Sequence, residues 1–150
     1  MPKMLILYHS QEYGNTDKMA RAIADGAKEA GIEPSLVNTN LDRMNVDDYR
    51  QYDVVAFGSP DYYSYIAGGL KMFLDDWYIA KKKDPQGLVD KTYGVFYSHG
   101  GGGAVRKVLE KLLARMGTQV GDVVESIGSP GDKELENCRL LGRQLAESAQ

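Results

Sequence analysis

Residues 4–16, MLILYHSQEYGNT, give the clearest indication of the fold of this chain. An apolar run over residues 4–8 gives way to a hydroxyl-rich turn, and an Ala-rich segment with helical spacing follows. Ser10, Thr16 and the first free backbone N–H groups of such a helix can all donate to phosphate oxygens, and the helix dipole adds positive potential there. The segment therefore predicts a strand, a phosphate-binding turn and a helix, in that order.

The glycine pattern of this turn excludes two other phosphate loops. A Walker loop requires G-x-x-x-x-G-K-[ST], and the dinucleotide fingerprint requires G-x-G-x-x-G, whereas Gly14 is the one glycine of the turn. The expected ligand is therefore a mononucleotide.

Beyond this segment, apolar runs alternate with segments of helical pattern along the whole chain. We expect strands at residues 3–8, 34–38, 53–58, 92–98 and 120–127. Such alternation is typical of repeated βαβ units, which form a parallel sheet covered on both faces. No linker, repeat or low-complexity tract interrupts the pattern, so residues 1–150 are predicted to form one α/β domain.

The predicted helices differ in how clearly they are marked. The first should run from Asn15 to Ala30, with Gly31 as its left-handed stop, and the second, within residues 46–52, should be short or absent. Apolar spacing marks the buried stripe of the first helix at Met19, Ala20, Ile23, Ala24 and Ala27. The fourth helix, ended by Gly117, should bury Val105, Val108, Leu109, Leu112, Leu113 and Met116.

The last helix is opened by Ser129-Pro130 and Asp132, and its buried stripe should comprise Leu135, Cys138, Leu141 and Leu145. Cys138 is most simply a small buried apolar residue on this stripe, with a redox role as the alternative. Lys81, Lys82 and Lys83 fit the solvated end of a helix, with a docking patch for an acidic partner as the alternative.

Composition excludes several classes of function. The net charge of -3 and the pI near 5.4 argue against nucleic acid as a partner, since phosphate neutralisation needs a basic face. One cysteine permits no internal disulfide and no Cys-based metal cluster, and His9 and His99 lack metal-ligand spacing, so we expect no metal and a cytoplasmic location. The sequence shows no secretory leader and no apolar stretch long enough to cross a bilayer, so no membrane partner is expected.

Three loops should converge on one ligand, because a doubly wound sheet binds ligands outside the carboxyl ends of its strands. They follow the first, third and fourth predicted strands, at residues 10–16, 59–69 and 98–103. The second loop places three tyrosines beside polar groups, where a ring can stack between them; the alternative is packing on the surface or at a subunit contact.

The third loop reads Ser98-His99-Gly100-Gly101-Gly102-Gly103. Four successive glycines cost chain entropy on ordering, and close approach of the backbone to a flat ligand would explain them, as would a flexible turn before a helix. His99 is a candidate proton donor to a reduced substrate, because imidazole titrates near neutral pH; the alternative is a purely hydrogen-bonding role. Hydrolytic Ser-His-Asp chemistry is poorly supported, since G-x-S-x-G is absent.

With these three loops the chain resembles the flavodoxin-like FMN-binding family over essentially its whole length. Ser10-x-x-Tyr13-Gly14-Asn15-Thr16 is similar to the FMN phosphate loop. Gly58-Ser59-Pro60-x-Tyr62-Tyr63, followed by Gly69-x-Lys71-x-Phe73-Leu74-Asp75, is similar to the second flavin loop of flavodoxin-fold quinone reductases and flavodiiron proteins, and Ser98-His99-Gly100-Gly101 looks like their third.

The resemblance implies a three-layer sandwich with a five-stranded parallel sheet of order 2-1-3-4-5 and FMN as cofactor. His99 is the candidate catalytic residue because of the chemistry of its imidazole. The implied cofactor-binding residues are Ser10, Gln11, Glu12, Tyr13, Gly14, Asn15, Thr16, Ser59, Pro60, Asp61, Tyr62, Tyr63, Ser64, Tyr65, Ser98, His99, Gly100, Gly101, Gly102 and Gly103.

Two redox functions follow from the resemblance, and departures from the family divide them. The third loop, which consists of bare glycines, and the small net charge of -3 strengthen the resemblance to NAD(P)H-dependent quinone or FMN oxidoreductases, which admit a flat substrate. The chain length leaves no room for the inserted segments of such reductases, which favours a carrier of electrons between protein partners. Ser64 stands where relatives often have glycine, so a backbone flip coupled to flavin protonation is not implied. A flavin-binding regulatory module without redox activity is a third reading, and a homo-oligomer is left open.

Overall fold

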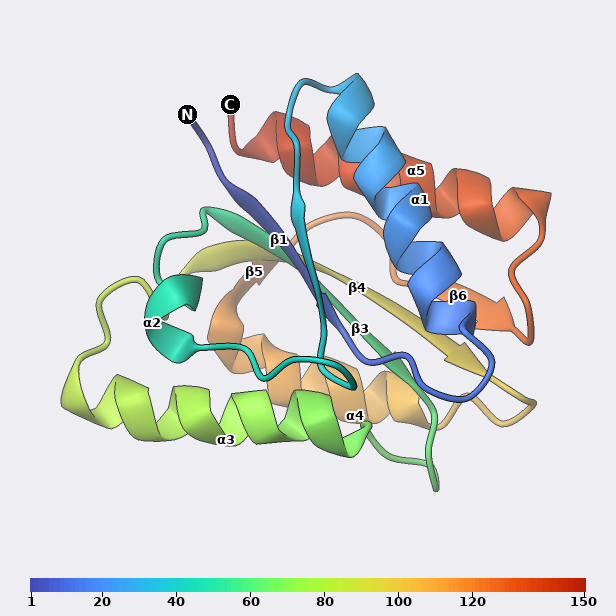
Figure 1. The fold of residues 1–150 in the computed structure, drawn as a ribbon, viewed down its shortest axis with the longest axis horizontal. Coiled ribbons are helices and arrows are strands. Elements are labelled where there is room, and N and C mark those ends of the chain that lie inside the picture. Colours follow the sequence, from blue (N-terminus) through green and yellow to red (C-terminus); the bar gives the residue numbers. More distant parts are fainter.

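A parallel β-sheet between two layers of helices forms the centre of the computed structural model, which describes residues 1–150 (Figure 1). Its main path is β2-β1-β3-β4-β5, and β6 also pairs with β4, all in parallel. The strands are β1 (Met4–Tyr8), β2 (Ser35–Asn38), β3 (Val54–Pro60), β4 (Lys91–His99), β5 (Gly117–Gln119) and β6 (Val124–Ile127). The predicted strand order and single α/β domain architecture are confirmed.

The predicted fifth strand at residues 120–127 is wrong as one continuous element. β5 ends at Gln119 and pairs with the first residues of β4, whereas β6 begins at Val124 and pairs with its last residues. Between them Gly121 has a φ of 74°, a left-handed conformation that interrupts an extended strand. The prediction also ended β3 and β4 too early, since Pro60 and His99 are their last residues.

The helices are α1 (Asn15–Glu29), α2 (Val46–Tyr49), α3 (Gly68–Lys83), α4 (Val105–Leu113), the 3₁₀ turn η1 (Ala114–Met116) and α5 (Asp132–Ser148). α1 and α5 cover one face of the sheet, and α3 and α4 cover the other (Figure 1). Alternation along β1 divides its side chains between the two cores: Leu5 and Leu7 face α3 and α4, and Ile6 faces α1 and α5. Both faces are therefore apolar, as a parallel sheet requires.

Most of the predicted helix features are confirmed. Gly31 takes a φ of 95° just beyond α1, α2 has one short turn, and the predicted stripe of α1 is buried. On α4 the expectation is partly wrong, because Val108 and Leu112 are only half-buried; Leu135 on α5 is half-buried as well. The helix also tightens into η1 before Gly117.

Close contact between α1 and α5 fixes the position of the helix that carries the first loop. A Cβ added to Gly26 would lie 2.0 Å from the carbonyl oxygen of Arg139, and one added to Gly142 would lie 2.0 Å from that of Ile23. Glycine at both positions therefore allows the two backbones to touch, and α1 is held firmly against α5.

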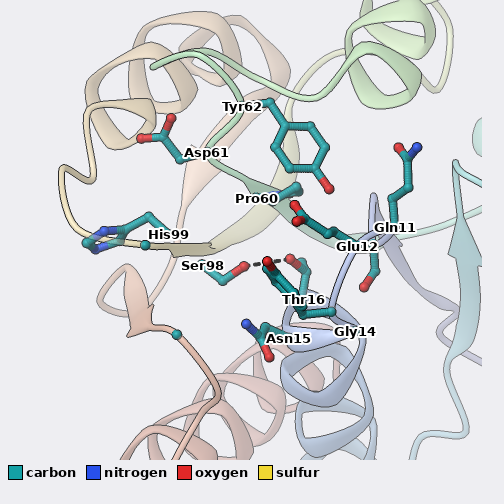
Figure 2. Close-up of a pocket in the computed structure, with 14 residues that line it drawn as sticks. Gln11, Glu12, Gly14, Asn15, Thr16, Pro60, Asp61, Tyr62, Ser98 and His99 are labelled. Carbon is teal, nitrogen blue, oxygen red and sulfur yellow. Dashed lines mark hydrogen bonds between the residues drawn. The ribbon is translucent and has the colours of Figure 1, made fainter.

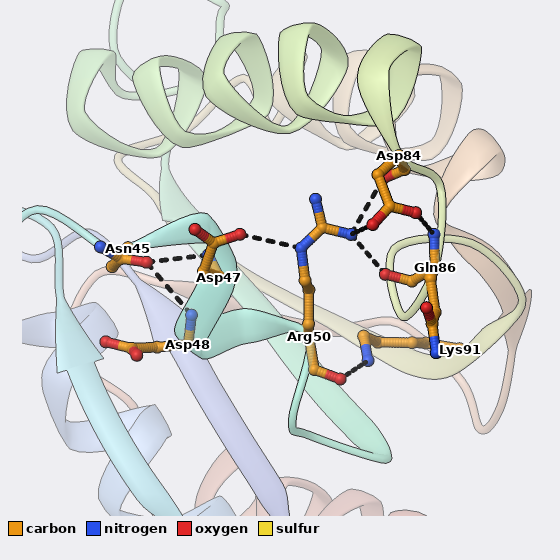
Figure 3. A network of polar contacts seen from close by, with 7 residues as sticks. All are labelled: Asn45, Asp47, Asp48, Arg50, Asp84, Gln86 and Lys91. Atoms are coloured by element: carbon orange, nitrogen blue, oxygen red, sulfur yellow. Dashed lines mark hydrogen bonds and ion pairs between the residues drawn. The ribbon is translucent and has the colours of Figure 1, made fainter.

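A polar network at the amino end of β4 ties α2 to the chain after α3 (Figure 3). Arg50 donates to the carbonyl oxygens of Asp84 and Gln86, and Lys91 donates to those of Arg50 and Tyr52. Burial lowers the pKa of Lys91. Because Lys91 opens β4 and His99 ends it, this network braces the sheet edge opposite to the three loops.

Two further sequence interpretations are confirmed. Lys82 and Lys83 are exposed in the last turn of α3, and the Lys81 ammonium lies 5.1 Å from the centroid of the Trp77 ring. Cys138 is buried, and desolvation raises the pKa of its thiol to about 12, which keeps it protonated and unreactive. None of the helices is both long and apolar enough to span a membrane.

Candidate functional site

A pocket of about 270 Å³ opens at the carboxyl ends of β1, β3, β4 and β6. Figure 2 shows Asp61 and Tyr62 on one side of it and Asn15 and Thr16 on the other. The lining residues are Ser10, Gln11, Glu12, Tyr13, Gly14, Asn15, Thr16, Pro60, Asp61, Tyr62, Ser98, His99, Gly100 and Gly128. The three predicted loops therefore meet at one site.

The first loop, residues 10–16, offers a cradle of unpaired donors. The backbone N–H groups of residues 11–16 donate to no atom of the protein, and Gly14 turns them toward the start of α1 with a φ of 76°. Successive free N–H groups at a helix N-terminus form a concavity for an anion. This arrangement fits the phosphate of a mononucleotide, and it needs no lysine.

Bonds from neighbouring elements hold this cradle in shape. The Asn38 side chain, at the end of β2, accepts from the Ser10 N–H at 3.0 Å and donates to the Ser10 carbonyl at 3.0 Å. The Ser10 hydroxyl accepts from the Asp17 N–H at 3.2 Å. The Thr16 and Ser98 hydroxyls lie 2.8 Å apart and are buried, so the first loop is bonded to the end of β4 (Figure 2).

The second loop contributes Pro60, Asp61 and Tyr62 to the pocket. Tyr62 and Tyr65 exchange backbone hydrogen bonds of 3.1 Å, and Tyr63 and Ser64 between them have φ values of 56° and 61°. These values define a tight turn of the I′ type, which leaves Tyr63 fully exposed. Of the three predicted tyrosines, Tyr62 alone faces the pocket.

Other residues of the second loop support it from behind. Ser59 is buried, donates to the Pro60 carbonyl at 2.7 Å and accepts from the Ala67 N–H at 3.0 Å, so its hydroxyl is engaged away from the pocket. The Asp61 carboxylate accepts from the Val105 N–H at 3.1 Å, at the start of α4. The second loop is thereby tied to the segment that follows the glycines.

His9 links the first two loops beneath the pocket. Its ring is buried, with Nδ1 2.8 Å from the Thr39 hydroxyl and Nε2 2.9 Å from the Gln11 side-chain oxygen. The Tyr62 ring stands edge-on to it at a centroid distance of 6.2 Å. His9 therefore orients both Gln11 and Tyr62.

The third loop lines the pocket with Ser98, His99 and Gly100, whereas Gly101, Gly102 and Gly103 lie outside the lining. His99 Nδ1 accepts from the Gly101 N–H at 3.0 Å, and Nε2 lies 2.9 Å from Glu125 Oε2. The Tyr97 hydroxyl donates to that same oxygen at 2.6 Å. Hydrogen bonds from Tyr97 and His99 lower the pKa of Glu125, and burial together with Glu125 raises the pKa of Tyr97 to about 12.

Sequence reasoning missed Gly128, Asn38 and Glu125. Gly128 lines the pocket directly after β6, and Asn38 ends β2. Ligands bind outside the carboxyl ends of the strands in such a sheet, and sequence reasoning considered only the ends of the first, third and fourth strands. Including the ends of the second and last strands would have identified both residues. Glu125 lies within β6, and no local sequence signal points to its bond with His99.

Fold and pocket together define an FMN-binding α/β redox protein with the flavodoxin architecture. A family profile described as flavodoxin matches residues 6–142, and the chain belongs to this family.

Three relatives illustrate its range. The chain is 31% identical to a flavodoxin of Aquifex aeolicus, covering 98% of this chain and 86% of the relative. It is 35% identical to NAD(P)H dehydrogenase (quinone) 3 of Rhizobium meliloti, covering 99% and 92%. The solved structure of a flavodoxin from the domain Archaea superposes with a TM-score of 0.82 at 26% identity, covering 98% of each chain.

Alignment lengths separate these relatives. The alignment with the quinone dehydrogenase extends over 203 positions and that with the Aquifex flavodoxin over 167, against 150 residues in this chain. The quinone dehydrogenase therefore has more inserted residues without a counterpart in this chain than the Aquifex flavodoxin has.

Proposed function

We propose that this protein is a small FMN electron carrier that exchanges electrons with a docked redox protein. The observation that carries this choice is the set of inserted segments in the quinone dehydrogenase relative, which this chain lacks. Without such segments the pocket consists of three strand-end loops and Gly128, and its mouth stays open at the surface. An open mouth suits exchange of electrons with a docked protein. The single buried cysteine suits a reducing compartment, and we place the protein in the cytoplasm.

The residues of the pocket have separable roles in this proposal. The free N–H groups of residues 11–16, with the hydroxyls of Ser10 and Thr16, hold the phosphate. Tyr62 offers an aromatic surface for the ring, and Ser98, His99 and Gly100 line a further part of the pocket wall. Bound FMN supplies one-electron and two-electron redox chemistry, while the protein binds and orients it.

The charge around the pocket affects how readily it accepts further negative charge. Asp61 lines the pocket, and its carboxylate is stabilised by the N–H of Val105 at the start of α4. A fixed negative group in a partly desolvated pocket disfavours a second negative charge nearby. We expect this arrangement to lower the midpoint potential of the second reduction step relative to free FMN.

A reductive titration and an enzyme assay test the proposal together. The purified protein should contain FMN, its photoreduction should resolve into two one-electron steps, and NADPH with a soluble quinone should be turned over slowly. Recovery of FAD, or absence of any flavin binding, would overturn the cofactor assignment. Rapid NADPH oxidation with a quinone would overturn the carrier assignment.

An NAD(P)H-dependent quinone reductase is the second candidate, and the glycine loop favours it. A Cβ added at Gly101 or Gly102 would meet no atom within 4 Å, so the rim beside the pocket has room for a flat molecule. If quinones bind there, Gly101→Tyr should slow quinone reduction by the reduced protein while FMN stays bound. An unchanged rate in the folded, flavin-loaded variant would instead favour transfer to a docked protein.

A further inference from the structure

The hydrogen bonds of His99 fix the position of its ring proton. The Gly101 N–H can only donate, so His99 Nδ1 must accept, and the proton of the neutral ring lies on Nε2, facing Glu125 Oε2. The side chain of His99 is only 3% exposed, and its ring stacks on Tyr97 at 5.6 Å. Both ring nitrogens are therefore engaged, and the Nδ1 bond holds the glycine loop to the end of β4.

The second histidine at this sheet edge shows why this arrangement responds to protons. His9 Nδ1 faces the Thr39 hydroxyl, which can either donate or accept, so protonation of His9 costs no hydrogen bond. His99 Nδ1 faces a backbone N–H, and a proton there would set two donors 3.0 Å apart. Protonation of His99 must therefore break its bond to Gly101, whereas protonation of His9 leaves its contacts in place.

We infer that His99 is a positioning residue that latches the loop Gly100–Gly103 beside the pocket when neutral and releases it when protonated. The loop can respond because Gly100, Gly101 and Gly102 have open space where side chains would be. A released run of glycines samples many conformations, so FMN binding would then have to order it at an entropic cost. The effect on FMN rests on the proposed function, while the latch itself does not.

Charged groups from every neighbouring element bear on this proton. Glu125 on β6 faces Nε2, and Tyr97 on β4 shares the same carboxylate oxygen. Arg106 on α4 lies close enough to act on both Tyr97 and Glu125, and its own partner is Glu110 at 3.4 Å. Asp61 lines the same pocket from the second loop. The charged and titratable groups near the ring are therefore the carboxylates of Glu125 and Asp61, the Tyr97 phenol and the Arg106 guanidinium.

Two variants separate the two bonds of His99. In His99→Asn the side-chain oxygen stands where Nδ1 was and can accept from the N–H two residues on, as in an Asx turn, without titrating. In His99→Gln the longer amide reaches toward Glu125 instead and leaves Gly101 without its acceptor. Gly100 precedes Gly101 in all three proteins, so the intrinsic exchange rate of the Gly101 amide is the same at a given pH.

The test is hydrogen exchange and the chemical shift of the Gly101 amide by NMR, on the full chain with and without FMN. At about pH 8 we expect exchange in His99→Gln to be about fivefold faster than in wild type and His99→Asn, the change expected for one net hydrogen bond. At about pH 5 wild type should match His99→Gln, while His99→Asn stays protected. Nitrogen shifts of the His99 ring should show the proton on Nε2 at the higher pH.

Several results would overturn the latch. These are equal exchange in wild type and His99→Gln at about pH 8, loss of protection in His99→Asn at about pH 5, or a ring proton on Nδ1 at the higher pH. If His99→Gln fails to fold, wild type and His99→Asn at the two pH values carry the test without it.

FMN affinity provides a separate readout. When the pH is lowered from about 8 to about 5, the FMN dissociation constant of wild type should rise about fivefold more than that of His99→Asn. His99→Asn is the control, because titration of the FMN phosphate affects both proteins equally. An equal rise in both would overturn the effect of the latch on the cofactor. Failure of wild type to bind FMN at either pH would overturn the proposed function and leave the amide result standing.

Discussion

The phosphate cradle at residues 10–16 and the glycine loop at residues 100–103 lie at the same sheet edge but are held in different ways. Asn38, Asp17 and Ser98 fix the cradle through several hydrogen bonds, and α1 behind it is locked to α5. The glycine loop has one bond to His99 near its start, and its Gly103 carbonyl accepts from the Arg106 N–H near its end. One region is therefore rigid, and the other depends on a few contacts.

This difference indicates how the pocket divides its tasks. Fixed donors suit a phosphate, whose charge and shape do not change during electron transfer. A loosely held rim suits the part of the pocket where electrons must enter and leave. Substitutions in the two regions test this division.

The largest effect is expected from Thr16→Ala in the cradle. Loss of a hydrogen bond to a charged group costs about 1.5–3 kcal/mol, and this should weaken FMN more than riboflavin, which lacks the phosphate. Ser98 also loses its buried partner, so the free energy of unfolding of the FMN-free chain should fall. Fluorescence titrations with both ligands measure the difference, and Thr16→Ser, which keeps the hydroxyl, is the control. Equal weakening of both ligands would place the phosphate elsewhere.

A valine at each of two glycines compares the regions directly. Gly14 has a φ of 76°, where a side chain costs about 1–2 kcal/mol, so Gly14→Val should weaken FMN about tenfold. Gly102 has no positive φ and open space around it, so Gly102→Val should change affinity by no more than about 0.5 kcal/mol. Isothermal titration of both variants with FMN measures this. A larger loss in Gly102→Val would mean that the glycine loop, rather than the cradle, anchors the ligand.

The same two regions show what the sequence could predict. The cradle follows from local chemistry, since the strand, the hydroxyls and the helix start are adjacent in the chain, and the strand order and buried stripe of α1 are confirmed. The glycine loop depends on Glu125, a residue 26 positions away that reaches His99 only through the pairing of β4 with β6. The division of the fifth strand into β5 and β6 was missed because apolar periodicity does not reveal the turn at Gly121.

Loop conformation likewise decided which tyrosine faces the pocket. Tyr62 lines it and Tyr63 is fully exposed, so Tyr62→Ala should weaken FMN and riboflavin alike by about 0.5–1.5 kcal/mol, while Tyr63→Ala should leave both affinities unchanged. The two variants are matched in residue type and are adjacent in the chain. Titration of each with both ligands is the measurement, and a loss in Tyr63→Ala would show that the turn rearranges when the ligand binds.

The smallest effect is expected from Glu125→Gln, which perturbs the support of the glycine loop. Hydrogen bonds from Tyr97 and His99 lower the pKa of Glu125 in the folded protein. The ionised carboxylate therefore stabilises the fold at pH values above the pKa of a glutamate in the unfolded chain. This contribution to the free energy of unfolding is lost as the pH falls through the lowered pKa. The side chain is 43% exposed, which screens the interaction and keeps the contribution below about 1 kcal/mol. Urea unfolding should therefore show wild type slightly more stable than the variant at about pH 7, with the difference vanishing near pH 3. If the difference in the free energy of unfolding persists undiminished in acid, Glu125 acts through packing and not through its charge. Support of the glycine loop would then not depend on pH, and the loop would be held as firmly as the cradle.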